Sequence, residues 1–307
     1  MQANINANTV KELRDITGVG IMDCKRALAA CNGDVEASVA WLRKHGLNNV
    51  GQKAGRTTAE GVIVIRNNGT QAVIVELNAE TDFVAKNEKF VELAGNIAEA
   101  AQYFNGSPEE FKNSELNGQK VSDVITQHVM IMGENINLNR ITHVKLTNSG
   151  IIANYTHNMV GNDNDIGKIG VLVVIESTAD QDILQGLGKQ LAMHIAAIKP
   201  EALTIEKLDK ALVEKEKEIF VEQCSKSGKS PELIEKMIDG RIRKFYEEVV
   251  LLEQPFVLDS KNKVRQILEN IGREVGHTVK IVEFVRFALG EKVQIKGSVK
   301  SNLQSST

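Results

Sequence analysis

Residues 72–85 read AVIVELNAETDFVA, and this stretch decides how the middle of the chain folds. It begins with an apolar run rich in β-branched residues, which predicts a buried strand. A helix over residues 87–104 follows, with its apolar side chains on one face. Asp82 and Phe83 therefore lie on a connection between two rigid elements. Because connections run over the surface, Phe83 either fills the core of its own domain or contacts another protein.

The order strand, turn, strand, helix occurs twice along the chain. Strand 61–65 turns through an Asn-Asn-Gly segment into strand 72–77 and the helix just described. Strand 151–155 leads through a polar loop into strand 170–175, and a helix over 180–198 follows. This repetition predicts two related α+β units packed side by side.

Two helical segments are expected outside these units, one near the start of the chain and one over residues 203–250. Three short helices are expected between Thr9 and His45, separated by turns that contain Gly18 and Gly33. Residues 203–250 carry a narrow apolar stripe on two highly charged helices, interrupted near Pro231. Such a stripe is typical of an antiparallel helical hairpin, a coiled coil, that projects into water.

The predicted fold class is therefore α+β, with a three-helix N-terminal module, two related core subdomains and a protruding helical hairpin. A last strand is expected over 279–289. The predicted boundaries are 1–47 for the module, 48–58 for a linker, 59–140 for core subdomain N, 141–202 with 251–291 for core subdomain C, 203–250 for the hairpin and 292–307 for a frayed C-terminal tail.

Composition and charge exclude several classes of function. The chain has 307 residues, a formal net charge of −3 and three cysteines without CxxC spacing. This charge argues against a protein that coats nucleic acid, and the cysteine pattern favours the reducing cytosol. No apolar stretch is long enough to span a membrane, and the first residues carry no export signal. We therefore expect a cytoplasmic protein without membrane or nucleic-acid partners.

The sequence offers almost no catalytic machinery. The six histidines are scattered, without acidic or cysteine partners at metal-ligand spacing. No phosphate-binding loop, GxGxxG or GxSxG motif occurs, so we expect no bound nucleotide, cofactor or metal and no enzyme activity.

Asp163 and Asp165 lie in a Gly/Asn loop, where paired acids usually form only a solvated turn. His194 is either a packed histidine or a contact residue at an interface. A chain of this size without a catalytic site is expected to act by binding another macromolecule.

Several strings, taken in order, resemble the bacterial translation elongation factor Ts family over most of the chain. The opening module carries 10-VKELR-14 and 17-TGVGIMDCKRAL-28, and the centre carries 81-TDFVA-85. Further strings are 133-GENI-136, 169-IGVL-172, 192-AMHIAA-197 and 254-QPFV-257. The N-terminal module is also similar to the ubiquitin-associated shape of that family. Family members commonly end with a further short helix that touches the partner, but residues 293–307 here are polar and show no apolar stripe. Residues 105–127 are weakly patterned, so the resemblance assigns them no role.

This resemblance implies a guanine-nucleotide exchange factor that binds elongation factor Tu, promotes GDP release and allows GTP rebinding during protein biosynthesis. It implies that Thr81, Asp82, Phe83 and Val84 disturb the Mg²⁺ and phosphate site of that partner. It further implies contacts by Ile21, Met22, Lys25 and Lys53 with the same domain of the partner, and by Ile169, Gly170 and His194 with another. The alternative is an adaptor whose ubiquitin-associated-like module binds peptides.

Overall fold

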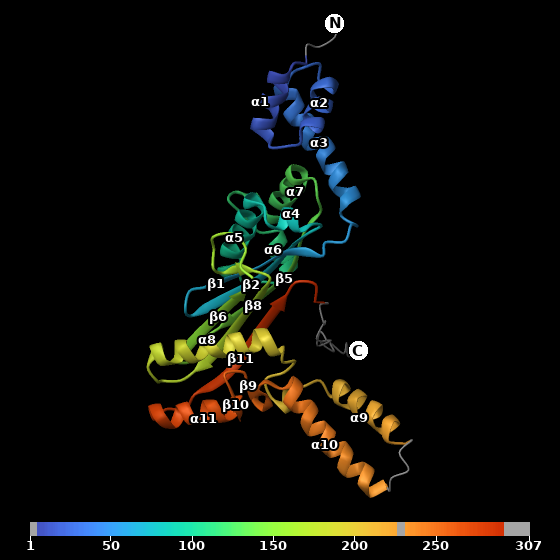
Figure 1. Cartoon of the computed structure of the whole chain (residues 1–307). Helices are drawn as coiled ribbons and strands as arrows, with labels where there is room; N and C mark the ends of the chain where they lie inside the picture. The colour runs from blue at the N-terminus through green and yellow to red at the C-terminus, as the bar shows by residue number, and fades with distance from the viewer. Residues whose placement is uncertain (1–4, 226–230, 292–307) are drawn as a thin grey trace, which may run out of the picture.

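A computed structural model describes residues 5–225 and 231–291, and two antiparallel sheets form its centre (Figure 1). The first sheet has the strand order β5-β2-β1-β7 and the second the order β11-β8-β6. Their bounds are β1 (Glu60–Asn67), β2 (Gln71–Ala79), β5 (Ile136–Lys145), β7 (Ile166–Gly167), β6 (Gly150–His157), β8 (Ile169–Glu176) and β11 (Lys280–Ala288).

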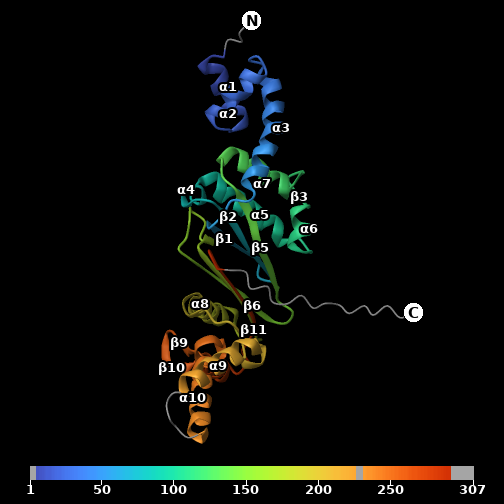
Figure 2. The same ribbon diagram turned by 90° about the vertical axis from the view of Figure 1, so that its right-hand side faces the viewer.

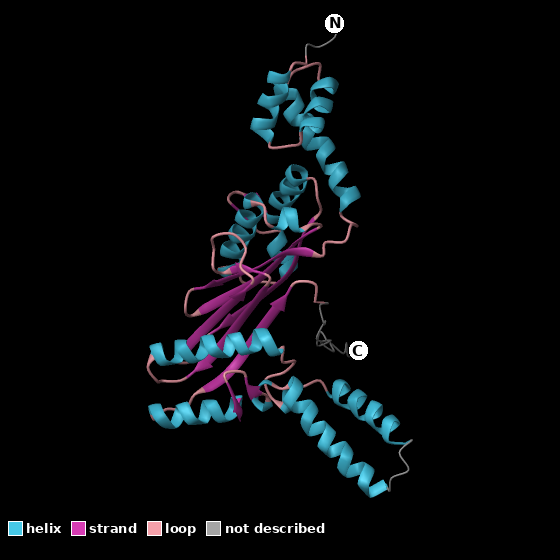
Figure 3. Cartoon of the chain, viewed as in Figure 1, coloured by secondary structure: helices cyan, strands magenta, loops and turns pink. Residues whose placement is uncertain are grey.

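The two sheets pack face to face, with helices on their outer sides (Figure 3). Ile63 and Ile74 of the first sheet share a buried cluster with Leu172 and Val174 of the second. The opposite face of the first sheet packs on α5 (Glu88–Gln102) and α7 (Val121–Met132). The outer face of the second sheet packs on α8 (Gln181–Ile198) and α11 (Val264–Val275). Strands buried on both faces explain why their sequences read as continuous apolar runs.

Both predicted strand, turn, strand, helix units are present. The first is β1, β2 and α5, and the second is β6, β8 and α8. The sequence did not indicate β5, which pairs with β2 from Ile136 to Lys145. The boundary predicted at residue 140 therefore falls inside a strand of the first sheet and is corrected to the end of β5. Mixed helix and strand content agrees with the predicted α+β class.

The N-terminal helices are α1 (Ala7–Thr17), α2 (Ile21–Ala30) and α3 (Val35–Lys53), which share a small buried core. Side chains of Asn6 and Asp34 cap α1 and α3. Gly18 ends α1 in the left-handed region, at φ 68°. Because α3 continues to Lys53, the first part of the predicted linker is helical. Val50, near the end of α3, packs against the core of the first sheet.

Two further helices, α9 (Lys210–Ser225) and α10 (Pro231–Val249), extend side by side away from the sheets (Figures 1 and 2). Arg241 of α10 lies 2.8 Å from the Glu216 carboxylate of α9. At the base, a β-bridge joins Ala202 to Val250. The turn between these helices and the predicted C-terminal tail lie outside the described residues.

The remaining elements are short. They are α4 (Asp82–Ala85), α6 (Pro108–Lys112), β3 (Glu115–Leu116), β4 (Gln119–Lys120), β9 (Pro255–Phe256), β10 (Asp259–Lys263) and the 3-10 turns η1 (Ile205–Lys207) and η2 (Leu251–Glu253).

Candidate partner-binding surface

The turn that carries Phe83 is a single helical turn, α4, held between β2 and α5. Thr81 caps the start of α4 by accepting a hydrogen bond from the Val84 amide. Asn87 caps the start of α5 in the same way, accepting from the Lys89 amide at 3.0 Å. Two helix starts within seven residues leave the chain few alternative conformations. The direction in which α4 presents its side chains is therefore fixed by local hydrogen bonding.

Phe83 points into solvent although the turn that carries it is anchored to the core. Its side chain is 84% exposed, whereas Ala85, two residues later, is fully buried. Val84 packs partly against the core of the first sheet. Of the two alternatives left open by the sequence, filling its own core is therefore wrong for Phe83. An exposed benzyl ring on a rigid turn is suited to insertion into a pocket of another molecule.

Asp82 is engaged within its own turn. Its carboxylate accepts a hydrogen bond from the Lys86 ammonium at 2.8 Å, in an i,i+4 arrangement. This hydrogen bond lowers the pKa of Asp82 and raises that of Lys86. The ammonium of Lys168, which bonds Glu60 at 3.1 Å, adds to the positive field around the carboxylate. Asp82 is therefore ionised at neutral pH and supports the turn.

The N-terminal module presents a second apolar surface at the first turn of α2. Ile21 and Met22 are exposed, Met22 by 68%, and Lys25 is exposed one turn later. Lys53 is half-buried in the last turn of α3. In Figure 2, α2 and α4 lie along the same side of the elongated molecule. The exposed residues of α2 could therefore contact the same partner as Phe83.

The structure corrects two of the three contacts expected from the second unit. Gly170 is buried between the sheets, where an added Cβ would lie 2.7 Å from Ile63 and 2.9 Å from Ile74. His194 is fully buried on α8. Neither residue can present a side chain to a partner, so their expected direct contacts are replaced by packing roles. Ile169 is half-buried at the start of β8 and keeps some accessible surface.

His194 holds a loop through both of its ring nitrogens. Nε2 lies 2.9 Å from Gln254 Oε1, and Nδ1 accepts the Val257 amide at 3.1 Å. Since the Gln254 amide group donates to the Glu248 carbonyl, its oxygen faces His194, which therefore donates from Nε2. Burial lowers the pKa of His194, against the opposing effect of the Gln254 hydrogen bond. A neutral His194 thus fixes the segment that joins β9 to β10.

That segment exposes apolar residues that were not among the contacts expected from the sequence. Val257 and Leu258 are exposed at the tip of the β9–β10 hairpin, and Ile198 is exposed at the end of α8. The apolar run Phe256-Val257-Leu258 at the turn of a short hairpin is a signal that could have identified them. The hairpin lies on the same side of the molecule as α4 in Figure 2. We name Val257, Leu258 and Ile198 the β9–β10 apolar surface.

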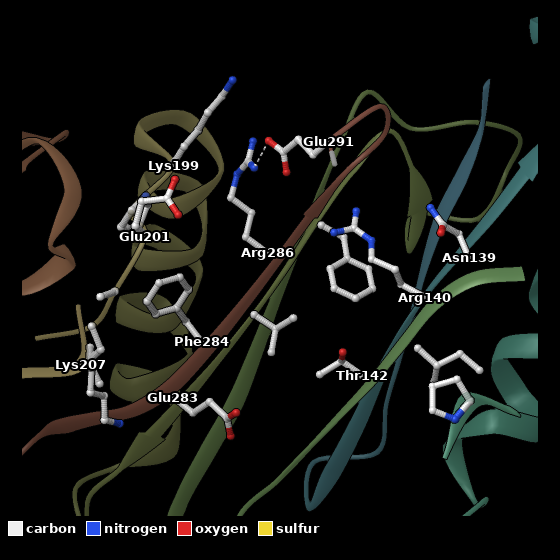
Figure 4. Close-up of a pocket in the computed structure, with 17 residues that line it drawn as sticks. Asn139, Arg140, Thr142, Lys199, Glu201, Lys207, Glu283, Phe284, Arg286 and Glu291 are labelled. Atoms are coloured by element: carbon white, nitrogen blue, oxygen red, sulfur yellow. Dashed lines mark hydrogen bonds and ion pairs between the residues drawn. The ribbon is translucent and has the colours of Figure 1, made fainter. Parts of the chain in front are cut away.

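A groove of about 780 Å³ runs along the edge strands β5 and β11, and both of the arginines that line it are engaged within the chain (Figure 4). Arg286 points toward Glu291 and pairs with it at 2.6 Å. Arg140 lies over the Phe287 ring, 4.0 Å from its centroid. The described residues that line the groove include no histidine, cysteine or serine. This lining offers no nucleophile paired with a base.

The described residues show neither a metal-binding cluster nor a membrane-spanning helix. Within residues 5–225 and 231–291, no three His, Cys, Asp or Glu side chains come together to hold a metal ion. None of the described helices is long and apolar enough to cross a bilayer. Asp163 and Asp165 lie in a turn where Arg66 bonds Asp163 at 2.9 Å and Asn154 bonds Asp165 at 2.8 Å.

Comparison with known proteins points to one family. The sequence pattern of the family described as Elongation factor TS matches residues 80–291. The chain is 48% identical over 291 residues to Elongation factor Ts of Brucella anthropi, covering 95% of this chain and 94% of that protein. It is 46% identical over 291 residues to Elongation factor Ts of Brucella ovis and of Brucella canis, with the same coverage.

Proposed function

The chain belongs to the elongation factor Ts family of translation factors, and from this premise we propose that it is a guanine-nucleotide exchange factor for elongation factor Tu. It binds that protein in the cytoplasm, promotes the release of GDP and allows GTP to bind. It does so without changing a covalent bond and without holding the nucleotide itself.

The exposed Phe83 is the observation that supports this proposal most strongly. The ring is 84% exposed and so accessible to a pocket, and the doubly capped turn that carries it loses little backbone entropy when it binds. In the proposed mechanism Thr81, Asp82, Phe83 and Val84 approach the nucleotide-binding domain of the partner near its Mg²⁺ ion. Since Mg²⁺ bridges phosphates in such sites, displacing its surroundings weakens the grip on the nucleotide.

Two other surfaces extend the proposed contact. Ile21, Met22, Lys25 and Lys53 would contact the same domain of the partner. The β9–β10 apolar surface and the accessible part of Ile169 would contact another domain. In this assignment His194 positions the β9–β10 hairpin instead of touching the partner, and Gly170 allows the two sheets to approach. Contact at several separated points favours one orientation of the partner.

The energetics of exchange require only differential binding. The factor must bind nucleotide-free partner more tightly than GDP-bound partner, and GDP then weakens its binding by the same factor. A ten-thousandfold effect corresponds to about 5.5 kcal/mol. One buried aromatic anchor contributes about 2–4 kcal/mol, and the disturbed Mg²⁺ ligands would contribute the remainder.

The proposal is tested by following the release of fluorescent GDP from elongation factor Tu after adding a small amount of the chain. We expect the rate of release to rise with the concentration of the chain and each molecule to act repeatedly. An unchanged rate, despite detectable binding, would contradict the exchange function and favour the peptide-binding adaptor.

A further inference from the structure

We propose that Glu134 is a positioning residue for nucleotide exchange: it holds Thr81 so that α4 presents Phe83 in one orientation. This inference rests on the proposed function and deepens it. It concerns a residue that contacts neither the exposed ring nor, in our account, the partner. Hydrogen bonds join the residues that follow β2 to the turn between α7 and β5 and hold Thr81 in place.

Both oxygens of the Glu134 carboxylate bind the residue that caps α4. Oε2 accepts the Thr81 backbone N–H at 3.0 Å, and Oε1 accepts the Thr81 hydroxyl at 2.7 Å. The two residues are 53 positions apart in the chain. Because its only proton goes to Glu134, the hydroxyl turns a lone pair toward the Val84 amide, which donates to it at 3.5 Å. Glu134 therefore orients the capping group itself.

The neighbouring residues make the reciprocal contact. Glu80 Oε1 accepts the Asn135 backbone N–H at 2.6 Å. The Asn135 side chain then donates to the Arg56 carbonyl at 3.0 Å, on the connection that follows α3. Residue pairs 80–81 and 134–135 are thus linked by carboxylate-to-backbone hydrogen bonds in both directions. Such crossed bonds resist both sliding and rotation of one segment against the other.

The position of Glu134 is itself fixed. Gly133 ends α7 in the left-handed region, at φ 78°, and its amide bonds the Val129 carbonyl. Val129 is buried in the core of the first sheet, so the end of α7 is anchored. A carboxylate on an anchored turn that meets two donors of one residue is a strong, directional contact. The two bonds go to different oxygens of Glu134, so a glutamine in the same orientation turns its NH2 group toward one of the two Thr81 donors and accepts only the other bond.

The test is a double-mutant cycle on the rate of GDP release from elongation factor Tu. We expect Glu134→Gln to lower the exchange rate constant at low factor concentration about tenfold, as for the loss of one charge-assisted hydrogen bond. In the Phe83→Ala background the same substitution should have less than about a twofold effect, since the group that it positions is gone. Equal effects in both backgrounds, or no effect in either, would overturn the inference while leaving the exchange function intact.

The chain provides a matched control. Glu110 accepts both the N–H and the hydroxyl of Ser107, at 2.7 and 2.8 Å, at the start of α6. Here one oxygen, Oε2, accepts both bonds. Glu110→Gln makes the same change from carboxylate to amide at a helix start away from Phe83, so GDP release should stay within about twofold of the unsubstituted chain. A loss equal to that of Glu134→Gln would show a general effect on folding and overturn the positioning role.

Hydrogen exchange of the backbone amides, measured on the chain without its partner, tests the positioning role of Glu134 separately from nucleotide exchange. Glu134→Gln should speed hydrogen exchange of the Val84 and Ala85 amides about tenfold, and Glu110→Gln should leave them unchanged. If the Val84 and Ala85 amides of Glu134→Gln exchanged hydrogen as slowly as in the unsubstituted chain, the positioning role would be overturned, even if this variant released GDP more slowly. If the unsubstituted chain fails to release GDP, the proposed function falls, and the positioning role for exchange falls with it whatever the amides show. Thr81→Val keeps the backbone N–H but removes the hydroxyl that bonds Glu134 and caps α4. It provides a second variant and should also lower the rate of GDP release about tenfold.

Discussion

At the scale of single residues, the main feature is an apolar side chain kept in water by its neighbours. Ala85 and part of Val84 anchor α4 to the core, and the caps at Thr81 and Asn87 fix its ends. The backbone geometry then directs Phe83 outward. An exposed Phe of this kind gains little for folding and is suited to recognition.

Phe83→Ala should therefore leave stability almost unchanged. We expect its free energy of unfolding to stay within about 0.5 kcal/mol of the unsubstituted chain, as for exposed positions without special contacts. Phe90→Ala, at a fully buried ring of α5, is the matched control and should lose about 3–5 kcal/mol. Urea denaturation measures both. A loss of 2 kcal/mol or more (about half the control's) in Phe83→Ala would show that the ring supports the fold.

His194 should make stability depend on pH in the acid range. Its folded pKa is lowered by burial, so the stability it contributes is complete above about pH 6.5 and is lost as pH falls through the folded value. In that window the free energy of unfolding should fall by up to about 1.4 kcal/mol per pH unit from this group. His194→Gln, which can accept the Val257 amide and donate to Gln254, should remove that part of the slope. Identical pH profiles for both chains would contradict the assignment.

At the scale of elements, three strands meet at one buried ion pair. Glu76 of β2, 1% exposed, lies 2.5 Å from the Arg140 guanidinium of β5. Arg140 also donates to the Ala288 carbonyl of β11 at 3.2 Å and lies over the Phe287 ring. This arrangement ties the edge strands of the two sheets together. It also explains how Glu76 can occupy a strand with apolar neighbours on both sides.

Removing one partner of this pair should be costly. Arg140→Ala leaves Glu76 buried without its guanidinium, and we expect a loss of about 3–5 kcal/mol in the free energy of unfolding. The double variant Glu76→Leu with Arg140→Met replaces the pair by apolar groups of similar size and should recover most of that loss. Thermal or urea denaturation compares the two. A single variant as stable as the unsubstituted chain would contradict the structural role of the pair.

The elements that could be predicted from sequence are those with an uninterrupted apolar pattern. β2 and β8 are continuous apolar runs, and α8 carries its apolar residues on one buried face. β5 was missed because it lies at the edge of its sheet and alternates with polar residues such as Asn137 and Asn139. The end of α3 was misjudged because Gly51 and Gly55 suggested a linker, whereas tertiary packing of Val50 extends the helix.

The sequence could indicate which residues belong to the candidate site, but not which way their side chains point. The connection between β2 and α5 marked Phe83, but only the caps show that its ring points outward. His194 could not be assigned from sequence because its partners Gln254 and Val257 are 60 and 63 residues away. The same holds for Glu134, whose contact with Thr81 depends on how α7 packs.

At the scale of the whole molecule, an elongated chain places its apolar surfaces far apart along one side. The N-terminal helices extend from one end and α9 with α10 from the other (Figure 2). Ala202, Leu208 and Val250 form a separate buried cluster at the base of the latter pair. The outer part of this pair is thus independent of the sandwich core.

Excising residues 215–243 should leave the remainder folded. The deletion keeps the base cluster, and a Gly-Ser linker can join the ends because Glu216 and Arg241 face each other across the pair. We expect the melting temperature to change by less than about 4 °C, the shift expected from about 1 kcal/mol in a chain of this size. Differential scanning calorimetry tests this expectation. Aggregation or a lost transition would show that the outer helices support the core.

The most direct test of the account is the rate of fluorescent GDP release from elongation factor Tu with the unsubstituted chain and with Phe83→Ala, at equal concentrations of folded protein. We expect the unsubstituted chain to release GDP fast and in proportion to its concentration. Phe83→Ala should release it about thirtyfold or more slowly, as for the loss of at least 2 kcal/mol at an aromatic anchor. Equal rates for the two chains would contradict the claim that this exposed ring carries out the exchange.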